Sequence, residues 1–193
     1  MLRSMNIKMV PFCALGFLTG AKNQALDLAR LQAKAFRKGH YLDSEHFPIF
    51  RFILEVICDF LGDPSFENEG GPIGETIFTE LIKNWRDPDP NSLGPLLIAA
   101  CDFHTYRCKP TRAEEFVEFD AGNWIRIPIE ILLVAKLRQE IGLSTASIDH
   151  PLMENPFGSL PAEVGFMPDV LTRRVRDRMS ADGFDETLIL DQV

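Results

Sequence analysis

Four side chains with metal-binding or catalytic chemistry lie close together in the middle of the chain: Cys101, Asp102, His104 and Cys108. On a helix, residues three, four and seven positions apart face the same side, so the two cysteines and the histidine would share a face. Cysteine and histidine are common zinc ligands. Structural zinc sites usually combine closely spaced ligand pairs from two elements, however, and the chain has no second Cys or His pair. We therefore expect no metal site and interpret the group as core thiols beside a hydrogen-bonded histidine.

The remaining sequence lacks the motifs of common enzyme classes. It contains no G-x-S-x-G, no H-E-x-x-H and no phosphate-binding G-x-x-x-x-G-K-[ST]. The glycines of residues 70–74 could receive an anion at a helix start, but no lysine follows them, which favours a flexible turn. The four histidines occupy no motif that would place a base beside a nucleophile. We expect a protein without catalytic residues and without a cofactor.

A second candidate site, in residues 114–120, is acidic and aromatic. Aromatic anchors surrounded by charges are typical of protein interfaces. We therefore predict that six residues of this segment bind a partner protein: Glu114, Glu115, Phe116, Glu118, Phe119 and Asp120. An acid/base pair of Glu114 and Glu118 is less favoured, because 28 acidic residues make such spacings common. The competing interpretation is a solvated face over a buried aromatic edge.

The composition narrows the classes of partner. The 193 residues include 20 Lys and Arg against 28 Asp and Glu, a net charge of −8, so phosphate backbones would repel the chain and nucleic acid is not expected as a partner. No apolar run reaches the roughly 18 residues that a membrane-spanning helix needs. The four cysteines lie in apolar or helical surroundings, which predicts reduced core thiols and a cytoplasmic protein.

The N-terminus offers an alternative location. Arg3 and Lys8 precede an apolar stretch from Met9 to Leu18, a weak version of a signal-peptide pattern that would direct the chain to the periplasm. We instead expect this stretch to be retained and packed against the rest of the protein.

Hydrophobic periodicity predicts an all-α fold, a multi-helix bundle of about six helices in one domain that spans residues 1–193. The expected helices cover approximately residues 21–39, 46–61, 73–85, 91–109, 129–141 and 169–179. The fourth is nearly apolar in its first half, so we expect it at the centre of the bundle. In the fifth, we expect four polar residues to face solvent: Lys136, Arg138, Gln139 and Glu140.

Two C-terminal features complete the predicted architecture. Residues 143–168 contain four prolines, which break helices and central strands, so we predict a long irregular loop of a kind that is often functional. The last helix contains four arginines from Arg173 to Arg178, and we expect it to pair with the acidic surface of the same chain.

The sequence resembles the small all-helical immunity proteins that are encoded beside bacterial polymorphic toxins and type VI secretion effectors. The features that resemble that family are the size, the acidic charge, the successive helices, the Asp102-Phe-His104 helix, the segment after Pro128 and the proline-rich loop with His150. No functional residue of the family maps onto this chain. The resemblance implies a protein that binds a cognate toxin and blocks it without turnover, and the acidic charge would suit a basic toxin.

Two other functions remain open from the sequence. One is a helical enzyme or small-molecule binder with an inter-helix pocket near Asp102 and His104. The other is a homo-oligomeric scaffold whose apolar faces bury one another, and a homodimer would also be compatible with toxin inhibition.

Overall fold

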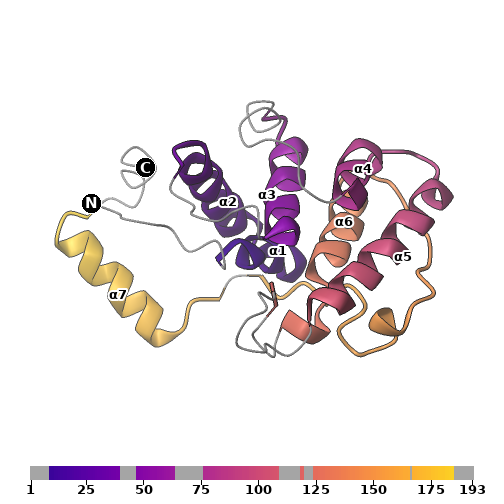
Figure 1. Cartoon of the computed structure of the whole chain (residues 1–193). Coiled ribbons are helices and arrows are strands. Elements are labelled where there is room, and N and C mark those ends of the chain that lie inside the picture. Colours follow the sequence, from indigo (N-terminus) through magenta and orange to yellow (C-terminus); the bar gives the residue numbers. More distant parts are fainter. Residues whose placement is uncertain are drawn as a thin grey trace, which may run out of the picture.

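The computed structural model describes residues 9–39, 47–63, 76–108, 118–119, 124–165 and 167–184. Within these ranges the protein is helical and contains no strand, which confirms the predicted all-α fold (Figure 1). Two short 3-10 turns lie at Trp124–Arg126 and Pro151–Met153. The α-helices are α1 (Val10–Thr19), α2 (Lys22–Arg37), α3 (Pro48–Phe60), α4 (Thr76–Asn84), α5 (Pro90–Arg107), α6 (Ile129–Glu140) and α7 (Val170–Ala181).

Helices α1, α3 and α6 form the centre of the packed body. Helix α1 contacts α2, α3 and α6, and α3 also contacts α2 and α4 (Figure 1). Helix α5 contacts α4 and α6 at one side of the body, so its predicted central position is wrong. Only one face of α5 is buried, because its partners cover one side, and Ile98 and Tyr106 remain exposed.

Helix α1 is the element that the periodicity did not predict as a helix. The apolar stretch is packed in the core, as expected, and six of its ten residues are buried. A helix surrounded by neighbours needs no polar face, so its sequence shows no amphipathic pattern. Pro11 fits the first turn, and Gly20 ends the helix in the left-handed conformation at φ 85°.

Helices α1 and α2 approach each other closely through small residues. A Cβ atom at Gly16 would lie 2.8 Å from the Cβ of Ala25, so a larger residue at Gly16 would push the helices apart. Ala25, Ala29 and Ala33 form the buried stripe of α2. This packing brings the start of α2 close to the end of α1.

Helix α6 is buried on nearly all sides, which corrects its predicted solvent-facing side. Gln139 and Glu140 are exposed as expected, but Lys136 and Arg138 are buried. Arg138 Nη1 donates to the carbonyls of Trp85 at 2.6 Å and Asp87 at 2.8 Å, and its Nε donates to the Ser144 carbonyl at 2.9 Å. These bonds satisfy the guanidinium in place of water and tie α6 to the turn after α4.

Lys136 fastens the C-terminal loop to the body. Its ammonium forms ion pairs with Glu140, at 3.1 Å, and with Glu163. The two carboxylates, with Glu163 first, raise the pKa of Lys136 above its usual value. The buried stem of Lys136 therefore ends in paired charge, which makes its burial tolerable.

The long loop after α6 is irregular, as predicted, apart from the turn at Pro151–Met153. The N–H groups of Val164 and Gly165 donate to the Thr19 carbonyl at 3.0 and 2.9 Å, so the loop crosses the end of α1 before the chain enters α7. Within the described ranges, every helix is too short or too polar to cross a bilayer.

Candidate functional site

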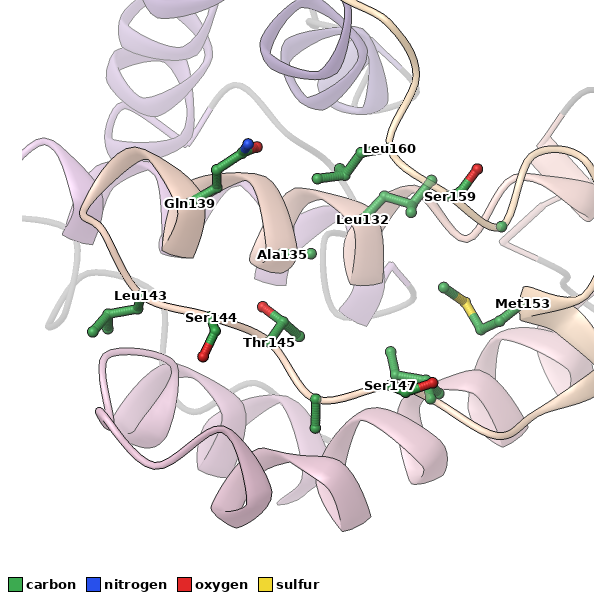
Figure 2. Close-up of a pocket in the computed structure, with 13 residues that line it drawn as sticks. Leu132, Ala135, Gln139, Leu143, Ser144, Thr145, Ser147, Met153, Ser159 and Leu160 are labelled. Carbon is green, nitrogen blue, oxygen red and sulfur yellow. The ribbon is translucent and has the colours of Figure 1, made fainter.

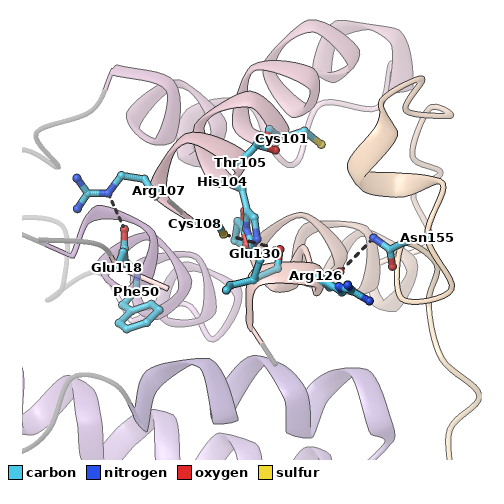
Figure 3. Close-up of polar contacts among 11 residues, drawn as sticks. Phe50, Cys101, His104, Thr105, Arg107, Cys108, Glu118, Arg126, Glu130 and Asn155 are labelled. Carbon is cyan, nitrogen blue, oxygen red and sulfur yellow. Dashed lines mark hydrogen bonds and ion pairs between the residues drawn. The ribbon is translucent and has the colours of Figure 1, made fainter. Parts of the chain in front are cut away.

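A fully buried histidine–glutamate pair lies between α5 and α6 (Figure 3). His104 Nδ1 lies 2.8 Å from Glu130 Oε1, and both side chains are fully buried. The Phe119 ring covers the imidazole with ring centroids 4.4 Å apart. Burial alone would lower the pKa of His104, but the Glu130 carboxylate and the Cys108 thiol raise it to about 10. The protonated imidazole is therefore favoured at neutral pH.

A second buried carboxylate, Glu118, lies close to this pair (Figure 3). Its Oε1 accepts the Phe50 N–H at 2.8 Å, and its Oε2 lies 3.7 Å from Arg107 Nε. Burial raises the pKa of Glu118 to about 8, against the opposing effects of the Phe50 N–H and the Arg107 guanidinium. Glu118 Oε2 and Glu130 Oε2 are both buried without a hydrogen bond. The three acid–base groups thus form one cluster inside the body, in which His104 is charged and Glu118 is mostly protonated at neutral pH.

This cluster corrects part of the predicted partner-binding segment. Glu118 and Phe119 are each 1% exposed, so the expectation that they lie on the surface is wrong. Their side chains contact the core because Phe50 and His104 lie opposite them. The other four predicted residues, Glu114, Glu115, Phe116 and Asp120, lie outside the described residues.

Of the candidate zinc ligands, Cys108 interacts with His104, but Cys101 and Asp102 do not join them in a ligand set. Cys101 is buried, and burial raises the pKa of its thiol to about 12. The Asp102 side chain is 73% exposed and lies 3.2 Å from His150 Nε2. The Cys108 thiol faces the Ile125 carbonyl at 3.8 Å. Within the described residues, no three potential ligands come together in a metal-binding arrangement.

The cluster is sealed, which limits its chemistry. Neither side chain of the His104–Glu130 pair reaches solvent, so a substrate cannot contact it in this conformation. The enzyme alternative predicted a pocket between helices at Asp102 and His104, but neither residue lines the pocket beside α6.

The pocket lies instead between α6 and the loop that follows it (Figure 2). Its volume of about 490 Å³ is within the range of ligand pockets, roughly 300–1,000 Å³. Its polar lining consists of uncharged side chains, and Thr145 Oγ1 is shielded from solvent without a hydrogen bond. Its apolar lining includes Leu132, Ala135, Leu143, Ile148, Met153 and Leu160. An apolar or uncharged group would fit it.

Helix α7 is the third candidate, and it lies away from the other helices (Figure 1). None of its 12 residues is buried. Leu171 is 68% exposed, and Val170 and Val175 are also exposed. The helix begins at Asp169, whose Oδ1 accepts the Thr172 N–H at 2.6 Å. Its formation thus depends on a local cap rather than on packing.

The predicted pairing of this helix with the acidic body is wrong for the arginines whose contacts are resolved. Arg178 Nε binds Asp182 Oδ2 at 2.8 Å, one turn further along. Arg173 Nη1 donates to the Pro168 carbonyl at 2.9 Å, just before the helix. These arginines therefore bind within the C-terminal segment and not to the helical body.

Sequence reasoning found the helix of α7 and the irregular loop but missed the pocket and the isolation of α7. The four prolines of the loop were the only signal for the pocket, because they keep the chain from packing as a helix over α6. Comparison of the chain with protein-family models, with curated proteins and with solved structures gave no match.

Proposed function

We propose that this protein acts by stoichiometric binding to another protein and that α7 is its docking element. The observation that supports the proposal is the exposure of an apolar and arginine-rich helix, none of whose residues is buried in the described part of the structure. An isolated helix of 12 residues is marginal in water, because most helical stability in proteins comes from tertiary packing. A partner that buries α7 would supply that packing.

The side chains of α7 suit a protein interface. Leu171 and Val175 lie one turn apart and present an apolar ridge, and Met167 before the helix is 83% exposed. Arginine is enriched among the residues that contribute most to binding, and α7 contains four. Apolar anchors with arginines around them would form a small interface, and the arginines would favour a partner surface of complementary charge.

A bacterial toxin is the partner class that we propose, in keeping with the resemblance to immunity proteins. The net charge of −8 favours the approach of a basic toxin, and the arginines of α7 would contact an acidic patch on that toxin. A protein that inhibits by occupancy needs no catalytic group, and the only histidine–carboxylate pair that is buried in the described structure is closed to solvent. The proposed role is therefore an immunity protein with α7 as part of its toxin-binding surface.

Affinity capture tests this proposal directly. The tagged protein is expressed with the products of the neighbouring open reading frames, and bound proteins are identified by mass. The wild type is expected to retain one partner in a 1:1 ratio. The double variant Leu171→Asp/Val175→Asp is expected to lose at least tenfold in affinity, because two charges replace the apolar ridge.

The matched control is Val164→Asp, which introduces the same charge at a side chain that is also 68% exposed but lies before α7. It is expected to bind as the wild type does. Equal affinity of the double variant and the wild type would remove α7 from the interface. Charge reversal at Glu114 and Glu115 tests the sequence-predicted acidic segment separately, with a slower association rate as its expected result.

A further inference from the structure

Among the residues that the structure describes, two complementary surfaces are accessible, the pocket beside α6 and the apolar ridge of α7. We propose that α7 of one copy docks in the α6 pocket of a second copy when no toxin is bound. This inference rests on the proposed function, because it assigns a second occupant to the same helix. It makes self-association a competitor of toxin binding.

The two surfaces match in shape and polarity. Leu132, Ala135 and Gln139 lie three and four residues apart, so they form one stripe of α6 along the pocket (Figure 2). In α7, Leu171 and Val175 repeat at four-residue spacing, which is the ridge that fits a groove on another helix. The stripe forms the floor of the pocket of about 490 Å³, and the exposed lining residues Ser147, Ser159 and Leu160 belong to the loop. Apolar side chains that enter the pocket would displace water from its apolar lining.

The charges around the two surfaces also match. The pocket lining contains no charged side chain, but Asp149 and Glu154 directly follow the lining residues Ile148 and Met153 and are exposed. Asp102 joins them through its contact with His150 at 3.2 Å. Arg174 and Arg178 flank the Leu171–Val175 ridge and would face these carboxylates across the rim, where partial hydration keeps the cost of desolvation low.

The path of the chain directs α7 away from its own body. Val164 and Gly165 are held to the Thr19 carbonyl, and Glu163 is held to Lys136, so the connection to α7 starts at the end of α1. Figure 1 places α7 beyond α2, on the opposite side of the molecule from α5. Exchange of α7 between two copies fills both pockets at once and gives a closed dimer with two identical contacts.

The oligomeric state tests the inference without any toxin. Light scattering after gel filtration is expected to give twice the monomer mass for the wild type. Leu171→Asp/Val175→Asp removes the ridge, and Ala135→Arg fills the pocket with a cation that repels the arginines of α7. Each variant alone is expected to be monomeric. Circular dichroism and thermal unfolding establish that each is folded, and Ser147→Arg replaces Ala135→Arg if that variant does not fold.

Mixing the two variants gives the sharper result. The ridge variant keeps an intact pocket and the pocket variant keeps an intact α7, so the mixture can form one native contact. A heterodimer is expected at concentrations where each variant alone is monomeric. A monomeric wild type, a dimeric ridge variant or a mixture that stays monomeric would each overturn the inference.

These outcomes separate this inference from the proposed function. A monomeric wild type that still captures a partner through α7 overturns self-association and leaves the function intact. A dimer that follows the expected mutational pattern, with no α7-dependent capture, supports the inference and overturns the function. A small molecule found in the pocket of a monomeric wild type would overturn docking of α7 there.

Discussion

Helices α6 and α7 have the same length, 12 residues each, and opposite surroundings. Nine residues of α6 are buried, including Glu130, Lys136 and Arg138, whereas no residue of α7 is buried. Both helices contain apolar side chains and arginine, so composition alone does not account for the difference. The neighbours of α6 supply hydrogen bonds for its charges and apolar contacts for the rest, whereas the contacts resolved for α7 include its cap and polar bonds within the C-terminal segment.

The contrast indicates where stability and where function lie in this molecule. Removal of a charged group from α6 should lower the free energy of unfolding strongly, because its buried partners are then left without a hydrogen bond. Removal of a charged or apolar group from α7 should change the free energy of unfolding of the free protein little. It should lower the affinity for a partner that covers the helix. Stability measurements should therefore respond to α6, and binding measurements to α7.

The largest expected difference comes from a matched pair of arginine substitutions. Arg138→Met leaves the carbonyls of Trp85, Asp87 and Ser144 without their donor, and we expect it to lower the free energy of unfolding by about 3–5 kcal/mol. At concentrations where the protein is monomeric, Arg174→Met on exposed α7 should change it by no more than about 0.5 kcal/mol. Denaturant unfolding of both variants measures the difference. Equal losses would contradict the contrast between the helices.

A smaller expected effect is the pH dependence of the cluster beside α6. The pKa of Glu118 is about 8 instead of 4.5, and that of His104 is about 10 instead of 6.5, so the folded protein keeps protons that the unfolded chain releases. The free energy of unfolding should therefore fall as the pH rises through both windows, most steeply between 6.5 and 8, where they overlap. Each group adds a slope of at most about 1.4 kcal/mol per pH unit.

Thermal unfolding at a series of pH values measures this slope. Glu118→Gln, which cannot ionise, should flatten the lower part of the curve, and Arg174→Met on α7 should leave the curve unchanged. Stability that rises between pH 6.5 and 8 would contradict the pKa values of the cluster.

The smallest expected effect comes from the helix caps. Asp169→Ala removes the cap of α7, and Asp89→Ala removes that of α5, where Oδ1 accepts the Asn91 N–H at 2.9 Å. Each cap contributes about 1 kcal/mol. At concentrations where the protein is monomeric, loss of the α7 cap should speed amide exchange in α7 about fivefold without changing the global stability, whereas loss of the α5 cap should lower the global stability. A lower global stability of the Asp169 variant would show that α7 is coupled to the body.

The sequence by itself determined the fold class and most helix positions. Periodic apolar residues, early prolines and terminal glycines are local signals, and they correctly placed α2, α3, α4, α5, α6 and α7 to within a few residues. The irregular loop after α6 followed from its four prolines for the same reason. Helix α1 was not predicted as a helix, because a segment that is apolar on every side has no hydrophobic periodicity to detect.

Only the tertiary structure decided which of these residues are buried and which surfaces stay open. Lys136 and Arg138 have the spacing of a solvent face, yet the Trp85 and Asp87 carbonyls and Glu163 lie opposite them and take the place of water. Glu118 has the composition of an acidic surface, yet it lies against the Phe50 N–H in the core. The apolar ridge of α7 has the sequence pattern of a packed helix, yet in the structure α7 lies away from the other helices. Periodicity records what one element needs to bury, and the long-range contacts determine whether anything is there to bury it.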